Sequence, residues 1–264
     1  MGYESEKDTK SKCASTPGLA MLERLRREPF NIATEEKLCS HPYIAAAESG
    51  SLTLAQRRAF AIEQFYIQRS DATSFAKLAG HVDWVAPTSL AVAKVPEAVV
   101  RPGASSSSSI PDLFQFLLGG EIYAAPLLLK HAQSIGLDEA TLKSSENSIR
   151  AISQAYPSYW ARLALGEQRA AGAAACAVNF PAWGRMCANM SAALASENHG
   201  YGYKGSGDEG LAFINFFATP IENLDEMAAN IIEAEGVSYE DLVGPVRLLQ
   251  EYELLFWDAV FAAE

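Results

Sequence analysis

The amino-acid sequence predicts an all-α fold, in which long helices pack as a bundle around one apolar core. From Gly18 onward, apolar residues recur at the three- and four-residue spacing of an amphipathic helix. Long periodic stretches alternate with short polar loops, and few segments are candidates for strands. Hydrophobic residues make up 49% of the 264 residues, which is ample material for such a core.

The helix that begins after Thr53 and ends near Gly80 has the clearest apolar period. Thr53 suits its N-terminus, because a threonine oxygen accepts a hydrogen bond from a free backbone N–H of the first turn. Further helices are expected over five stretches, at about 111–135, 145–165, 167–196, 209–234 and 239–262.

Two segments depart from the helical pattern. Residues 1–16 are polar and aperiodic, which predicts a disordered N-terminal tail. The stretch at about 82–110 is rich in proline and contains five consecutive serines, which indicates a surface insertion between two helices. We therefore expect a single helical domain over 17–264 that carries this insertion.

Composition restricts the partners and the compartment. The formal net charge of −11 repels phosphate backbones and anionic lipids, which argues against nucleic-acid and membrane partners. The four cysteines form no CxxC pair, so reduced thiols in an intracellular compartment are expected. No apolar run approaches the roughly 20 residues of a membrane span, and the N-terminus is charged. We expect a cytoplasmic protein.

Glu253 lies on the apolar face of the last helix. Its neighbours one turn away are Leu249, Phe256 and Trp257, whereas Glu251 belongs to the solvent face. A carboxyl in an apolar stripe loses solvation, so its pKa should rise, which suits a general acid or base. The alternative is a carboxylate at the rim of the stripe, tied to a backbone or arginine partner.

Cys176 is the second candidate, on the helix expected over 167–196. Gly172 and Ala173 precede it by a turn and leave room for close packing or a ligand, and Asn179 follows on the same face. A cysteine can act as a nucleophile, but a free cysteine is also a common inert core residue. Spacing alone leaves both readings open.

Other polar residues carry similar alternatives. Gln68 and Asp71 share one face of the 53–80 helix, which either lines an interior site or faces solvent. Tyr156 precedes Pro157, which disfavours the helical conformation and predicts a helix break there. The histidines lack the carboxylate spacing of a diiron site, so no metal or other cofactor is expected.

Several motifs together resemble the thiaminase II (TenA) family. The family's HPF segment and its following aromatic helix are similar to HPYIAAAESGSLTLAQRRAF and FYIQRSDATSFAK. Its nucleophile segment resembles ACAVNFPAWG, its WI-x-x-Y stretch resembles FINFFATP, and its final-helix motif resembles EYELLFWDAVF. The resemblance covers roughly residues 35 to 262 and implies a heme-oxygenase-like helical bundle and a homo-oligomer, either a dimer or a tetramer.

By this resemblance Cys176 falls on the nucleophile and Glu253 on the acid/base carboxylate. Tyr156 falls on a pocket tyrosine and Phe180 on an aromatic pocket wall. The family's pocket aspartate is replaced by Gln68, with Asp71 available a turn later, and its second pocket tyrosine becomes Phe217.

The implied function is that of an aminopyrimidine aminohydrolase of the thiaminase II type in thiamin salvage, acting on a small pyrimidine-like substrate. The resemblance therefore supports the catalytic pair more than the substrate. A site that binds ring nitrogens by hydrogen bonds loses affinity when one of its hydroxyl groups is missing. Two alternatives remain: a PqqC-like or heme-oxygenase-like oxidase, and a non-catalytic TenA-like binding protein.

Overall fold

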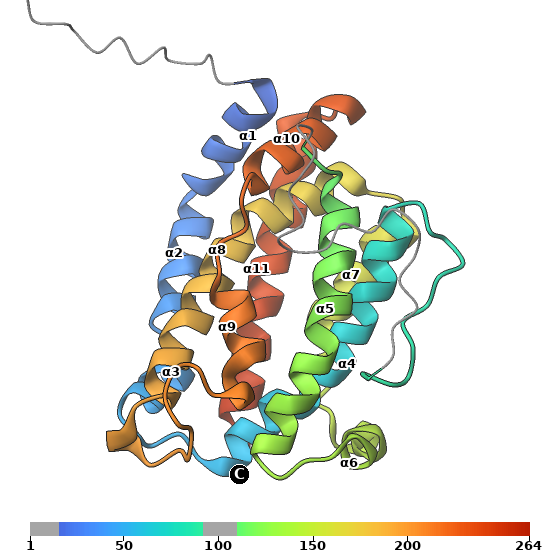
Figure 1. The fold of residues 1–264 in the computed structure, drawn as a ribbon. Coiled ribbons are helices and arrows are strands. Elements are labelled where there is room, and N and C mark those ends of the chain that lie inside the picture. Colours follow the sequence, from blue (N-terminus) through green and yellow to red (C-terminus); the bar gives the residue numbers. More distant parts are fainter. Residues whose placement is uncertain (1–15, 92–109) are drawn as a thin grey trace, which may run out of the picture.

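The fold is all-α throughout the described chain (Figure 1). The computed structural model describes residues 16–91 and 110–264. The tail over 1–15 and most of the predicted insertion therefore lie outside the described residues. The α-helices are α1 (Pro17–Arg26), α2 (Pro29–Cys39), α3 (Pro42–Glu48), α4 (Leu54–Leu78), α5 (Leu113–Ser134), α6 (Glu139–Ser144), α7 (Ala155–Leu165), α8 (Arg169–Leu194), α9 (Ala212–Ala218), α10 (Leu224–Glu235) and α11 (Tyr239–Phe261). Three short 3₁₀ turns are η1 (Ser145–Ser148), η2 (Glu197–His199) and η3 (Glu209–Leu211).

Helices α8 and α11 form the middle of the bundle. In Figure 1, α1 and α2 lie on one side of them and α4, α5 and α7 on the other, with α9 across one face. Helix α8 packs against α9, α10 and α11, and α4 packs against α5 and α7. The middle helices can therefore present side chains to both flanks.

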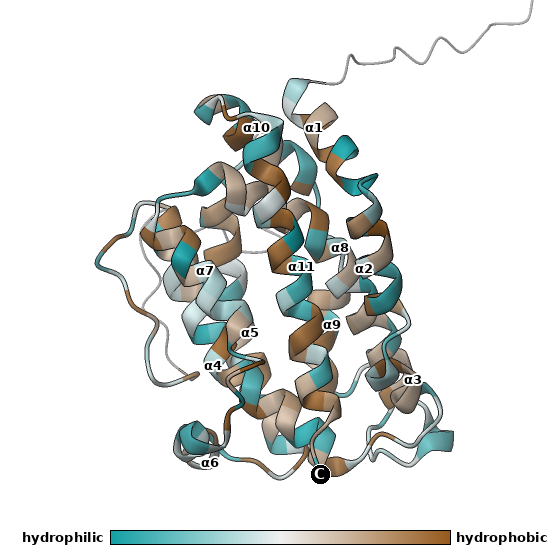
Figure 2. Cartoon of the chain, turned by 180° about the vertical axis from the view of Figure 1, so that it is seen from behind, coloured by the Kyte–Doolittle hydropathy of each residue, from teal (hydrophilic) through white to brown (hydrophobic). Residues whose placement is uncertain are grey.

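Apolar faces hold the bundle together. In Figure 2, the long helices carry both hydrophobic and hydrophilic residues. One core cluster contains Phe75, Phe114 and Trp160, and a second contains Phe60 and Trp257. Burying an aromatic side chain stabilises the fold by about 2 kcal/mol or more.

The longest predicted helices are confirmed. Thr53 caps α4, since its hydroxyl oxygen accepts from Gln56 N at 3.1 Å while the Gln56 side chain accepts from Thr53 N at 2.9 Å. On α11, Arg247 pairs with Glu251 on the solvent side, as the spacing predicts.

Two predicted helices have different bounds. Of the stretch 145–165, only Ala155–Leu165 is α-helical. The stretch 209–234 is divided between α9 and α10, because Pro220 has no N–H to continue the first of these helices. The predicted break at Tyr156 is wrong: Tyr156 and Pro157 lie in the first turn of α7, where a backbone N–H needs no helical partner.

By length and composition, α5 could cross a membrane, a feature that the sequence analysis missed. Half of its apolar window, 50%, is buried in the bundle, where α5 packs against α4 and α9. An apolar core helix passes the same composition test.

Candidate active site

Cys176 lies in the N-terminal half of α8 and is fully buried. Small residues around it allow neighbouring helices to approach, since a Cβ added at Gly172 would lie 3.2 Å from Phe114 and 3.3 Å from Trp160. Burial raises the pKa of the Cys176 thiol well above its usual value, and the charge of Asp225 adds to the effect. The resting thiol is therefore protonated.

Glu253 reaches the interior from α11 and is only 3% exposed. Asn179, one turn beyond Cys176 on α8, donates its side-chain N–H to one carboxyl oxygen. The indole Nε1 of Trp257 donates to the other at 3.3 Å. Burial raises the pKa of Glu253 to about 7, although both hydrogen bonds act to lower it. At neutral pH this carboxyl can both accept and release a proton.

Tyr156 is a half-buried tyrosine. It packs against both core clusters from the first turn of α7. Burial raises the pKa of its phenol well above the usual value, and the negative charges of Asp71 and Glu253 raise it further, with a smaller contribution from Cys176. These three groups come from α4, α11 and α8.

Glu63 fixes the chain just before Tyr156. This residue of α4 is 1% exposed and accepts hydrogen bonds from Arg150 N at 2.8 Å, from the Ser153 hydroxyl and from Gln154 Nε2 at 2.7 Å. A buried carboxylate with several donors is well satisfied. The network ties the turn that precedes α7 to α4 and thereby sets the position of Tyr156.

The polar face of α4 points inward. Gln68 and Asp71 are each 5% exposed, so the solvent-face alternative is wrong. Gln68 Nε2 donates to the backbone oxygen of Glu121 on α5 at 2.7 Å. Asp71 Oδ1 is buried without a hydrogen-bond partner in the described part of the chain, and burial raises the pKa of Asp71 well above its usual value.

Glu121 is a half-buried carboxyl on α5 that the sequence analysis did not assign to the site. It keeps part of its surface free, yet burial raises its pKa to about 8. Its helical neighbours Leu117, Ala124, Ala125 and Leu128 are all buried. A charged residue whose neighbours at three, four and seven positions are all apolar is the signal that could have identified it.

Aromatic side chains lie near Glu253. The ring of Phe217 on α9 lies 5.8 Å from that of Trp183, which in turn lies 5.5 Å from Trp257, the donor to Glu253. Phe180 is half-buried against the first core cluster. The predicted aromatic residues thus lie on α8 and α9, and Trp183 lies between Phe217 and the indole that donates to Glu253.

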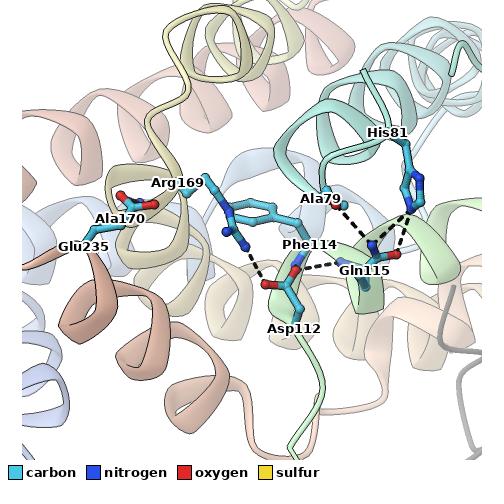
Figure 3. A network of polar contacts seen from close by, with 8 residues as sticks. All are labelled: Ala79, His81, Asp112, Phe114, Gln115, Arg169, Ala170 and Glu235. Atoms are coloured by element: carbon cyan, nitrogen blue, oxygen red, sulfur yellow. Dashed lines mark hydrogen bonds and ion pairs between the residues drawn. The ribbon is translucent and has the colours of Figure 1, made fainter. Parts of the chain in front are cut away.

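A different polar network lies where the N-termini of α5 and α8 meet the end of α10 (Figure 3). Arg169 pairs with Asp112, whose side chain caps α5, and Glu235 accepts from Ala170 N at 2.9 Å. A cavity of about 240 Å³ adjoins it and includes none of the predicted site residues. The carboxylates here act as helix caps.

The described residues contain no group of three or more His, Cys, Asp or Glu side chains arranged to hold a metal ion. His131, the most deeply buried histidine, lies 2.7 Å through Nδ1 from the backbone oxygen of Gly210. Burial lowers the pKa of His131 to about 4, so it is neutral at pH 7.

Together these features define a heme-oxygenase-like all-α bundle with polar groups in its interior. The chain belongs to the TENA/THI-4/PQQC family, whose model matches residues 33–263. Its fold is similar to that of a TenA homologue from P. horikoshii OT3, with a TM-score of 0.59 and 15% identity over 91% of this chain and 98% of that chain.

A TenA homologue from Pseudomonas syringae pv. tomato str. DC3000 is similar too, with a TM-score of 0.61 and 14% identity over 91% of this chain and 92% of that one. At such low sequence identities, these two structures support the fold assignment only. No protein with a curated description matches the sequence significantly.

Proposed function

We propose that this protein is an aminohydrolase of the thiaminase II type, which releases an amine from an aminopyrimidine. In this proposal Cys176 is the nucleophile and Glu253 the acid/base group. The observation that carries it is the hydrogen bond from Asn179 to Glu253, because Asn179 lies one turn beyond Cys176 on α8 and so joins the carboxyl of α11 to the helix that carries the thiol. A soft nucleophile and a titratable carboxyl at neighbouring helices suit addition to an electron-poor ring.

The chemistry needs no oxidant or reductant. The thiol sulfur forms a bond to a ring carbon, the displaced electron pair moves onto a ring nitrogen, and that nitrogen takes up a proton. The amine substituent then leaves with a proton and is replaced by the hydroxyl of a water molecule. The carbon–sulfur bond breaks and the thiol is restored.

The protonation states support these roles. Because burial keeps the Cys176 thiol protonated, its proton must leave as the carbon–sulfur bond forms. With a pKa of about 7, Glu253 can take up that proton and later give one to the departing amine. Asn179 and Trp257 hold its two oxygens and so fix its orientation.

Amine release from an aminomethyl-substituted aminopyrimidine tests the proposal. Cys176→Ala and Glu253→Gln should each lower kcat by at least about a hundredfold. Cys39→Ala is the control for the thiol, since Cys39 is a free, half-buried cysteine on α2. Glu251→Gln is the control for the carboxyl. Full activity of Cys176→Ala would contradict the proposal.

Small, pyrimidine-like substrates, a cytoplasmic location, a homo-oligomeric state and a place in thiamin salvage remain part of the same proposal. They rest on membership of the TENA/THI-4/PQQC family. The absence of a cofactor stays a prediction.

A further inference from the structure

At Ala177, the residue directly after Cys176, helix α8 has a backbone oxygen that lacks its regular donor. Helix α8 continues through Pro181 without interruption. Because proline has no backbone N–H, the carbonyl four residues before it receives no helical hydrogen bond. Ala177 is fully buried, so bulk solvent does not reach this oxygen. A buried carbonyl of this kind needs a donor from another part of the protein.

Arg26 supplies that donor from the end of α1. Its Nη2 donates to the oxygen of Ala177 at 2.8 Å. The same guanidinium binds both oxygens of Asp225, with Nη1 at 2.6 Å from Oδ2 and Nη2 at 2.5 Å from Oδ1. A charged, planar donor that a carboxylate holds at two points forms a stronger and better-directed hydrogen bond than a neutral one. Arg26 thus replaces, from outside α8, the hydrogen bond that Pro181 removes.

The contact between α1 and α10 holds this guanidinium in place. Arg26 is the last residue of α1, and Asp225 lies in the first turn of α10. Near the other end of the same two helices, Gly18 N donates to Glu233 Oε1 at 2.8 Å. A Cβ added at Gly18 would lie only 2.8 Å from the backbone oxygen of Ala229, so the helices are in close contact there. Helix α10 in turn packs against α8, and the guanidinium is therefore fixed relative to α8.

The groups of the proposed catalytic site lie on both sides of Ala177. Cys176 precedes it directly, and Asn179, two residues after it, donates to Glu253 of α11. A shift of the backbone at Ala177 would therefore move the thiol relative to that carboxyl. Reacting groups must be held closely, since a misplacement of about 1 Å can lower a rate about a hundredfold.

We propose that Arg26 is a positioning residue for Cys176. By donating to the carbonyl of Ala177 in place of the N–H that Pro181 lacks, it fixes the turn of α8 that carries the thiol. Arg26 acts through the backbone of α8 and touches no reacting atom. The inference rests on the proposed function in taking Cys176 as the nucleophile, whereas the hydrogen bond to Ala177 does not depend on that function.

Removal of the guanidinium should lower kcat and leave KM nearly unchanged, because Arg26 acts on the position of the thiol and not on the binding of substrate. Arg26→Met keeps the apolar stem of the side chain and should lower kcat for amine release about tenfold, with KM within about twofold. Arg26→Lys keeps a charged donor and should retain more of kcat than Arg26→Met. Unchanged kcat in Arg26→Met would overturn the proposal.

Arg27→Met is the matched control. Arg27 is the next residue along the chain, is exposed and pairs with Glu23 one turn before it. Its replacement removes the same type of charge at the same end of α1 but leaves the carbonyl of Ala177 with its donor. Neither kcat nor KM should change in this variant. A loss of kcat equal to that of Arg26→Met would show a general effect of charge and refute the positioning role.

A double-variant cycle with Pro181 separates positioning from a general loss of packing. Pro181→Ala restores a backbone N–H, so the oxygen of Ala177 regains a helical donor and Arg26 becomes dispensable. In the Pro181→Ala protein, Arg26→Met should therefore lower kcat by less than about twofold. The midpoint of urea denaturation should likewise fall less in this background than in the unmodified protein. Equal losses in both backgrounds would refute the link between Arg26 and Ala177.

The outcomes for Arg26 and for the catalytic proposal are distinguishable. Hydrolysis that depends on Cys176 but not on Arg26 would refute the positioning role alone. A protein that hydrolyses no aminopyrimidine, yet in which Pro181→Ala suppresses the loss of stability caused by Arg26→Met, would refute the aminohydrolase and leave Arg26 as the donor to Ala177.

Discussion

Glu253 should make the stability of the protein depend on pH in a way that a single substitution removes. In the unfolded chain its carboxyl ionises near 4.5, whereas in the folded protein burial raises its pKa to about 7. Between these values the unfolded chain has lost a proton that the folded protein still holds. Folding therefore becomes less favourable as the pH rises through this interval.

The size of the effect follows from the two pKa values. Their difference of about two and a half units corresponds to about 3 kcal/mol of unfolding free energy, lost mostly between pH 5 and pH 7.5. Glu253→Gln keeps the shape but cannot ionise. The free energy of unfolding of the variant, minus that of the unmodified protein, should therefore rise by about 3 kcal/mol between acid pH and pH 8.

Urea denaturation followed by tryptophan fluorescence, at intervals from pH 5 to pH 8, measures this difference directly. Groups that titrate in both proteins cancel when the two free energies are subtracted. Glu251→Gln, at an exposed position two residues earlier on α11, is the control for a glutamate-to-glutamine change. A difference between Glu253→Gln and the unmodified protein that does not change with pH would refute the assignment of a desolvated carboxyl.

Three further predictions concern groups around the site. Asn179→Ala removes a hydrogen bond that lowers the pKa of Glu253. The acidic limb of the kcat/KM profile, measured between pH 5 and 9, should therefore shift to higher pH, and a limb that stays at the same pH would contradict this. Glu63→Ala leaves several buried donors without an acceptor and should lower the free energy of unfolding by about 3 kcal/mol in urea, whereas a loss below about 1 kcal/mol would count against its role in positioning Tyr156. Thr53→Ala should cost about 1 kcal/mol in the same assay and Thr53→Ser much less, because serine can keep the cap of α4; equal losses would argue against the cap.

Sequence periodicity was sufficient for the long helices and for the inward face of the last one, whereas the face of Gln68 and Asp71 was settled only by their burial in the structure. The inward position of Glu253 follows from its apolar neighbours at helical spacing, and the structure confirms its burial. The start of α4 follows from the chemistry of one cap at Thr53. Both are local properties, so a single helix considered alone is enough to predict them.

Properties that depend on several helices were harder to predict. The closeness of Tyr156 to Asp71 and Glu253 depends on how α4, α7 and α11 pack together, and no spacing along the chain encodes it. The start of α7 was misjudged because Pro157 disfavours helix before it in general, but not in a first turn. Glu121 was considered only as a metal ligand with His131, whose spacing does not suit a diiron site, and its desolvation was not predicted.

The most direct test is a crystal structure of the Glu253→Gln protein with an aminopyrimidine bound. The ring should lie against Tyr156, with one of its carbons facing the sulfur of Cys176. A ring bound outside the bundle, or an interior filled by side chains that separate Cys176 from residue 253, would contradict the account.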